Sequence, residues 1–136
     1  MRGGNRSVTA FSATTTATVE VAWREILDAD GDATYEVSAT GPWGVVTETA
    51  SDAFEALVQV RRRLEPDNWF LAVAGARRDT YPSGMAREHG GLRAYVLQMG
   101  HPATELVSIF DDAPRELVAG VDEQREYSAR VARSFR

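Results

Sequence analysis

Strict alternation of apolar and polar residues in the first half of the chain restricts the fold more than any other feature. In "TATVEVAWREIL" (16–27) the apolar residues from Ala17 to Trp23 recur at every second position, and "TYEVSAT" (34–40) and "VVTETA" (45–50) continue the pattern. A period of two residues is that of a strand with one buried face. The short turns "DADGD" and "GPWG" separate the three segments. We therefore expect an antiparallel meander.

The period changes at Ser51, where "SDAFEALVQVRRRLEP" (51–66) takes up helical spacing. Ser51 is the predicted N-cap, and Pro66 stops the helix. Three apolar runs of strand length follow, and "VDEQREYSARVARSF" (121–135) predicts a second helix. The runs are "NWFLAVAGA", "LRAYVLQM" and "TELVSIF". The order β-β-β-α-β-β-β-α predicts an α+β fold, with a single, mostly antiparallel sheet of about six strands and two helices packed on one face.

Length and composition predict one domain over residues 1–136. The first twelve residues are rich in Gly, Ser and Thr, which favours a flexible N-terminal arm. No cysteine occurs, so disulfides and thiolate metal sites are excluded. We find neither a signal-peptide pattern nor an apolar run long enough for a bilayer, and we expect a cytoplasmic protein without membrane contact.

The charge is distributed unevenly, and all 15 basic residues are arginine. Residues 1–60 carry 3 basic and 9 acidic side chains, whereas residues 61–100 carry 7 and 4. An acidic first half could receive a basic partner, although it also suits a solvated strand surface. The candidate partner-binding residues are acidic, with one aromatic anchor in the next turn: Asp28, Asp30, Asp32, Asp111, Asp112 and Trp43.

The acidic turn has some of the spacing of a calcium loop but lacks its decisive residues. Asp28, Asp30 and Asp32 occupy positions one, three and five, yet Ala33 and Ala39 stand where glycine and a bidentate glutamate are needed. The segment is therefore a β-turn with exposed carboxylates.

Neither metal nor phosphate chemistry has a sequence signature. His89 and His101 are the only histidines, and neither has a second histidine at the spacing of a helical zinc motif. The glycine-rich phosphate loops are also missing. We expect no metal and no cofactor.

The segment "RRDTYPSGMAREHGG" (77–91) contains more residues with specific conformational roles than an ordinary connection needs. Arg77 and Asp79 can pair across a bend, Ser83 can cap a one-turn helix, and Gly90–Gly91 can release the chain into the next strand. Such constraint is typical of a loop that presents something. One alternative is therefore a small hydrolase-like enzyme that uses residues of this loop: Asp79, Tyr81, Ser83 and His89.

Another alternative is an RNA-associated module that uses arginines as phosphate ligands: Arg61, Arg62, Arg63, Arg77, Arg78 and Arg87. The net charge of −5 and the few aromatic residues between these arginines disfavour direct nucleic-acid binding.

A family resemblance rests mainly on this loop and extends over about residues 66–128 through "NWFLAVAGARRDTYPSGMAREHGGLRAYVLQMG", "ELVSIFDDA" and "VDEQREY". Its strongest positions are Gly75, Arg77, Asp79, Tyr81, Pro82, Ser83, Gly84, Met85 and Arg87. The chain resembles small bacterial immunity proteins of contact-dependent growth inhibition and related polymorphic toxin systems. It departs from the family pattern at His89 and Leu92, which predicts a specialised loop tip.

The resemblance implies a non-enzymatic protein that neutralises a cognate toxin domain by occluding its active site. Many such toxins are basic nucleases, which an acidic inhibitor would attract. A loop shared across a family cannot easily encode recognition of one partner. We therefore expect loop 77–91 to be structural, with the toxin contacts elsewhere.

Overall fold

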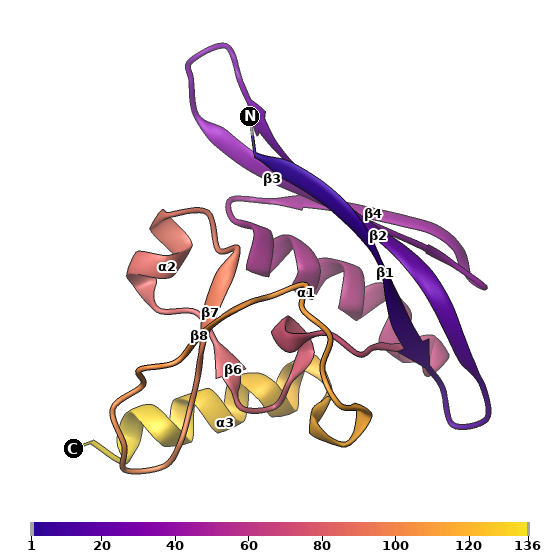
Figure 1. The fold of residues 1–136 in the computed structure, drawn as a ribbon. Helices are drawn as coiled ribbons and strands as arrows, with labels where there is room; N and C mark the ends of the chain where they lie inside the picture. Colours follow the sequence, from indigo (N-terminus) through magenta and orange to yellow (C-terminus); the bar gives the residue numbers. More distant parts are fainter. Residues whose placement is uncertain (1, 136) are drawn as a thin grey trace.

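The computed structural model describes residues 2–135 and confirms the α+β class (Figure 1). Eight strands are present over these residues: β1 (Gly3–Phe11), β2 (Thr16–Leu27), β3 (Ala33–Gly41), β4 (Gly44–Ala50), β5 (Phe70–Leu71), β6 (Thr80–Tyr81), β7 (Arg93–Val96) and β8 (Leu106–Ser108). The α-helices are α1 (Ala53–Leu64), α2 (Gly84–Glu88) and α3 (Val121–Arg133). Short 3-10 turns span Glu65–Asp67, Ala74–Ala76 and Arg115–Leu117.

The strands are divided between two antiparallel sheets instead of forming the single sheet expected. The large sheet has the order β4-β3-β2-β1-β5, and the small sheet has the order β6-β7-β8. In the large sheet, Val8 pairs with Val19 and Val21 pairs with Ala39, so the alternating apolar residues meet on one face. These four side chains are at most 2% exposed. The predicted meander is confirmed as β2-β3-β4.

The prediction of a flexible arm over residues 1–12 is wrong, because Gly3–Phe11 forms β1 and pairs with β2 along its whole length. Val8 and Ala10 are buried on the core face of the sheet. Gly4 lies against Trp23, where a Cβ atom would approach the indole to 2.7 Å. The glycines that suggested flexibility instead leave room for an aromatic ring on the neighbouring strand.

Helix α1 begins one residue later than predicted, and its N-cap is Asp52 instead of Ser51. Asp52 Oδ1 accepts the backbone N–H of Glu55 at 2.8 Å. The Asp52 carboxylate also forms an ion pair with Arg87, which lies far along the chain, and the local sequence pattern does not indicate this contact. The helix packs Phe54 and Leu57 into the core against β3 and β4.

The apolar run 68–76 forms only the two-residue strand β5 before it turns into a 3-10 helix. A Cβ atom at Gly75 would lie 2.8 Å from Leu57 and 2.9 Å from Ile109, so the chain bends where it passes closely between α1 and the end of β8. The run is apolar because it crosses the core. Its length predicted a longer strand than the two residues that the structure shows.

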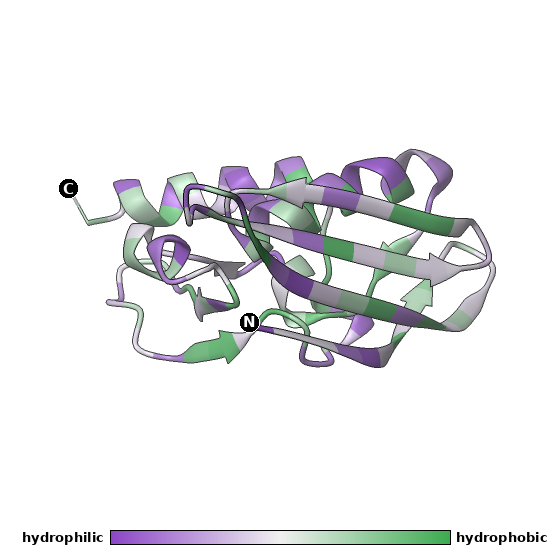
Figure 2. Cartoon of the chain, turned by 90° about the horizontal axis from the view of Figure 1, so that it is seen from above, coloured by the Kyte–Doolittle hydropathy of each residue, from purple (hydrophilic) through white to green (hydrophobic). Residues whose placement is uncertain are grey.

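The helices gather on one side of the large sheet, and hydrophilic and hydrophobic residues alternate along its strands (Figure 2). Helix α3 packs against α1 and β6, with Val121 and Val131 buried. The helix ends at Arg133, two residues earlier than predicted, and Phe135 beyond its end is 53% exposed. Over residues 2–135, the helices are too short or too polar to cross a membrane.

Candidate functional site

Two ion pairs fix loop 77–91, which we call the motif loop, to itself and to α1. Arg77 donates to both carboxylate oxygens of Asp79 at 2.8 and 2.7 Å, which confirms the predicted pair. These hydrogen bonds raise the pKa of Arg77 above its ordinary value. Arg87 Nη1 lies 3.1 Å from Oδ2 of the buried Asp52 and thereby ties the loop to the N-terminus of α1. Both pairs are internal contacts of the protein.

The middle of the loop also faces inward. Pro82 is buried, and the Tyr81 ring packs edge-on against Phe54 with 5.3 Å between ring centroids. Ser83 Oγ accepts the backbone N–H of Ala86 at 3.0 Å, so Ser83 caps α2 as predicted.

The first turn of α2 carries the outward-facing part of the loop. Gly84 begins the helix in open space, and the neighbouring Met85 is 70% exposed. An exposed methionine is a candidate for contact with another molecule.

The glycine pair closes the loop by close packing. Gly90 and Gly91 have φ angles of 105° and 67°. A Cβ atom at Gly90 would lie 2.5 Å from the Tyr35 hydroxyl, and one at Gly91 would lie 2.5 Å from Asp52 Oδ1. The chain then enters β7. Positive φ and the absence of a side chain are both required here.

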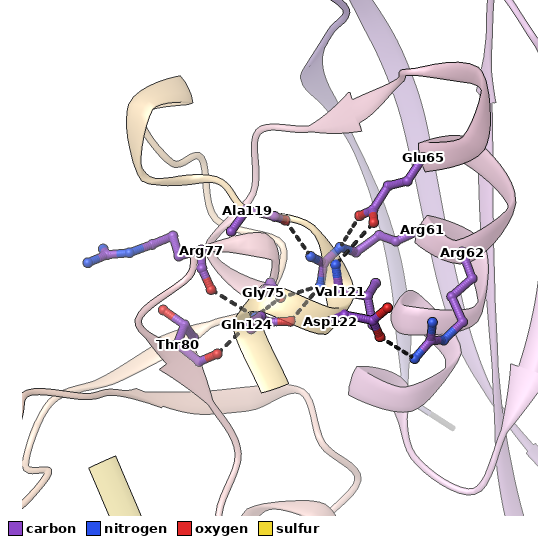
Figure 3. Close-up of polar contacts among 10 residues, drawn as sticks. All are labelled: Arg61, Arg62, Glu65, Gly75, Arg77, Thr80, Ala119, Val121, Asp122 and Gln124. Atoms are coloured by element: carbon purple, nitrogen blue, oxygen red, sulfur yellow. Dashed lines mark hydrogen bonds and ion pairs between the residues drawn. The ribbon is translucent and has the colours of Figure 1, made fainter. Parts of the chain in front are cut away.

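A buried polar cluster holds the start of the loop between α1 and α3 (Figure 3). Arg61 is 1% exposed and donates to Gln124 Oε1 at 2.7 Å and to the Ala119 carbonyl at 2.8 Å. Gln124 Nε2 donates to the carbonyls of Gly75, Arg77 and Thr80. Burial lowers the pKa of Arg61 to about 10, against the opposing charge of Glu65. This cluster anchors the backbone that leads from Gly75 into the loop.

The arginines that the RNA hypothesis needs each contact a carboxylate. Arg61 is buried beside Glu65 and cannot reach a ligand. The other pairs are Arg62–Asp122, Arg63–Glu48, Arg77–Asp79, Arg78–Glu123 and Arg87–Asp52. Phosphate would have to compete with these carboxylates, so the arrangement does not favour the RNA hypothesis.

The acidic turn forms the tip of the β2–β3 hairpin, which extends beyond the body of the protein (Figure 1). Asp28 Oδ1 accepts the backbone N–H groups of Asp30 and Asp32 at 2.8 and 2.9 Å, so Asp28 shapes the turn. All three residues are exposed. We call residues 28–32 the acidic hairpin tip.

Trp43 lies at the opposite end of β3 from the acidic hairpin tip, so the two cannot form one compact patch. The intervening strand has nine residues, which span about 30 Å. The indole Nε1 donates to the Ala39 carbonyl at 3.0 Å, and the ring packs edge-on against Trp69. The structure thus places Trp43 in an internal aromatic contact at the far end of the sheet.

Asp111 and Asp112 are exposed, but they share one cation. Arg6 of β1 lies 3.5 Å from Asp111 and 3.3 Å from Asp112. This pairing offsets part of the negative charge that the sequence suggested for a second acidic patch.

A polar network that the sequence did not predict lies at the base of the β2–β3 hairpin. Arg2 hydrogen-bonds the Tyr35 hydroxyl, and that hydroxyl donates to Glu25 at 2.8 Å. The Tyr35 hydrogen bond lowers the pKa of Glu25, whereas burial first, and then Glu25, raises the pKa of Tyr35. Arg2, Glu25 and Tyr35 line a cavity of about 460 Å³ together with Asp52 and Arg87.

A larger cavity of about 540 Å³ adjoins this network, since Arg2 borders both spaces. We call it the apolar cavity, from its apolar lining residues Trp23, Met85, Leu92, Tyr95, Leu106 and Phe110. Trp23 and Phe110 stack with ring centroids 4.2 Å apart. The inward position of Trp23 was predictable from strand alternation, but its partner, 87 residues away along the chain, was not.

Only two of the four residues of the enzyme hypothesis come together at this cavity. Ser83 and His89 both line it, whereas Asp79 and Tyr81 are outside the lining. Asp79 is held by Arg77, and Ser83 Oγ serves the helix cap. Within residues 2–135, no cluster of three or more His, Asp or Glu side chains could hold a metal ion.

Comparison with known proteins adds no family assignment: no protein-family model matches the chain, and no curated protein matches it either.

Proposed function

We propose that this protein is an immunity protein that binds a cognate toxin domain and occludes its active site. The single observation that carries the proposal is a contrast at one end of the protein: the polar side chains of the motif loop make internal contacts, whereas Met85 of the same loop and the surfaces beside it are exposed. The loop residues Arg77, Asp79, Ser83 and Arg87 are engaged in internal contacts. The acidic hairpin tip and the apolar cavity carry exposed charge and exposed apolar surface.

The proposed toxin-binding surface combines the acidic hairpin tip with the rim of the apolar cavity. Arg2 joins the base of this hairpin to the cavity, because it pairs with Glu25 at 3.5 Å and also lines the cavity. Met85 and Leu106 on the rim are 70% and 45% exposed. Exposed apolar residues beside a charged element are typical of a protein interface, with the apolar part supplying affinity and the charges supplying steering.

Co-expression with the toxin tests the proposal. The C-terminal domain of a large secreted protein encoded next to this gene would be expressed with and without this chain in a sensitive host. We expect the domain to arrest growth alone, and we expect this chain to restore growth and to co-purify with it. A folded chain that neither restores growth nor binds the domain would refute the proposal.

A hydrolase is the second candidate, favoured by the cavity that Ser83 and His89 share. His89→Ala separates the two functions, because His89 is exposed and the side chain is not needed for the cap of α2. A hydrolase would lose turnover in this variant while staying folded. An immunity protein would retain most of its protection.

A further inference from the structure

We propose that the apolar cavity is a binding site for a small hydrophobic anion, that is, a compact aromatic or aliphatic body that bears one carboxylate. The proposal does not depend on the toxin hypothesis. It rests on the charge of the cavity lining and on the arrangement of its walls.

The lining reverses the charge balance of the chain. The protein as a whole has 20 acidic and 15 basic residues. The cavity is lined by Arg2, Arg93 and the imidazole of His89, with no Asp or Glu among its lining residues. A site that excludes acids from a protein rich in acids is electrostatically complementary to an anion.

Arg93 is the cation available to the ligand. Arg2 is already held by Glu25 at 3.5 Å and by the carbonyl of His89 at 2.8 Å. Arg93 is exposed and, over residues 2–135, has no carboxylate within ion-pair distance. A guanidinium group binds a carboxylate through two parallel hydrogen bonds.

One face of the small sheet forms a wall of the site. Arg93 and Tyr95 are two residues apart on β7, so their side chains share a face, while the intervening Ala94 is buried in the core. Across the ladder, Arg93 pairs with Ser108 and Tyr95 pairs with Leu106. The wall therefore carries a cation and a hydroxyl at one level, and an aromatic ring and an aliphatic side chain at the next.

The stacked rings of Trp23 and Phe110 form part of the apolar lining, and Trp23 is the more exposed of the two, because Phe110 is only 3% exposed. A volume of about 540 Å³ is within the range of small-molecule sites in proteins. The apolar body of the ligand would lie against these rings, and its carboxylate would lie at Arg93 beside Ser108.

Calorimetric titration with 2-naphthoate and with 2-naphthalenemethanol tests the proposal, because the two probes share a ring system and differ in charge. For a carboxylate of this size we expect a Kd of about 1 mM or tighter. The neutral alcohol should bind about tenfold more weakly. Equal affinities, or no binding of 2-naphthoate, would overturn the proposal.

Variants locate the site. Arg93→Gln should weaken 2-naphthoate about tenfold and leave the alcohol unchanged, and Arg93→Lys should restore part of the loss. Arg133→Gln, which removes an exposed arginine outside the cavity lining, is the matched control and should change neither affinity. Ala86→Phe, which fills the cavity from α2, should weaken both probes. Equal effects of Arg93→Gln and Arg133→Gln, or a folded Ala86→Phe with normal binding, would place the ligand elsewhere.

Discussion

Replacement of Gln124 by methionine tests whether the motif loop is held by the buried polar cluster. Methionine has nearly the length of glutamine and favours helices, so the change removes hydrogen bonds with little change in packing. The Gln124 amide nitrogen donates to the carbonyls of Gly75, Arg77 and Thr80 at 2.8, 2.8 and 2.9 Å. The amide oxygen accepts a hydrogen bond from Arg61 at 2.7 Å.

The expected loss of unfolding free energy follows from these contacts. A buried polar group that loses its partner costs about 1–3 kcal/mol. The Gly75 carbonyl keeps a hydrogen bond from Arg61 at 3.3 Å, and the Arg77 carbonyl keeps one from the Thr80 N–H at 3.3 Å, so the four losses do not add fully. We expect a total loss of about 3–5 kcal/mol, which is a large part of the stability of a typical domain.

Urea denaturation followed by circular dichroism measures the loss. With a slope of about 1.5–2 kcal/mol per molar urea, the midpoint should fall by about 2 M. Gln59→Met is the matched control, because Gln59 is a partly exposed residue of α1 with one 3.3 Å hydrogen bond to Glu55. It should change stability by about 0.5 kcal/mol or less. If Gln124→Met and Gln59→Met have the same midpoint, the cluster does not hold the loop in place.

Two further predictions concern the neighbouring contacts. Gly91→Ala should lower the free energy of unfolding by about 2–3 kcal/mol or more, because the new side chain combines a positive φ with a clash against Asp52. The control Gly31→Ala, where φ is positive but the space is open, should lower it by about 1 kcal/mol. Equal losses of the two variants in urea melts would contradict this prediction. Tyr35→Phe should raise the pKa of Glu25 toward its ordinary value of 4.5, as followed by carboxyl carbon shifts in an NMR titration. Because the folded pKa lies below the unfolded value, the stabilisation by Glu25 is present above 4.5 and is lost as the pH falls through the folded pKa; an unchanged titration in Tyr35→Phe would contradict the assigned cause.

Local patterns were sufficient to predict the elements whose spacing of apolar residues reflects a single buried face. Strands β2, β3 and β4 follow from alternation, and α1 and α3 follow from helical spacing. Strand β1 was missed because its two glycines, its serine and its threonine resemble a loop, although threonine is also a strand former. Its burial depends on pairing with β2, and composition does not report pairing.

Within the loop, local contacts were predictable and distant ones were not. The Arg77–Asp79 pair and the Ser83 cap join residues two or three apart, so the sequence was sufficient to predict them. The Arg87–Asp52 pair and the Arg61–Gln124 hydrogen bond join residues 35 and 63 apart. A single sequence carries no signal for such contacts, because arginine and glutamine are usually found at the surface.

The candidate binding residues divide in the same way. The acidic hairpin tip was predictable, because a turn between two strands is exposed. The pairing of Trp43 with that turn was wrong, since consecutive hairpins of a meander turn at opposite ends of their shared strand. The apolar cavity combines residues from β2, α2, β7 and β8, and only the three-dimensional arrangement reveals it.

The affinity for the proposed toxin domain, measured by calorimetry at low and high salt with a charge-removing variant, tests the central claim most directly. Asp30→Asn/Asp32→Asn removes two carboxylates from the acidic hairpin tip and leaves the Asp28 side chain to form the turn. The control variant, Asp67→Asn/Glu116→Gln, also removes two exposed carboxylates. These lie near the Phe11 end of β1, where Phe70 and Arg115 contact Phe11. We predict that the hairpin variant binds about 3- to 30-fold more weakly at low salt, that the difference shrinks at 1 M salt, and that the control binds normally. Tight binding by both variants at every salt concentration, or no binding by the unmodified protein, would contradict the account.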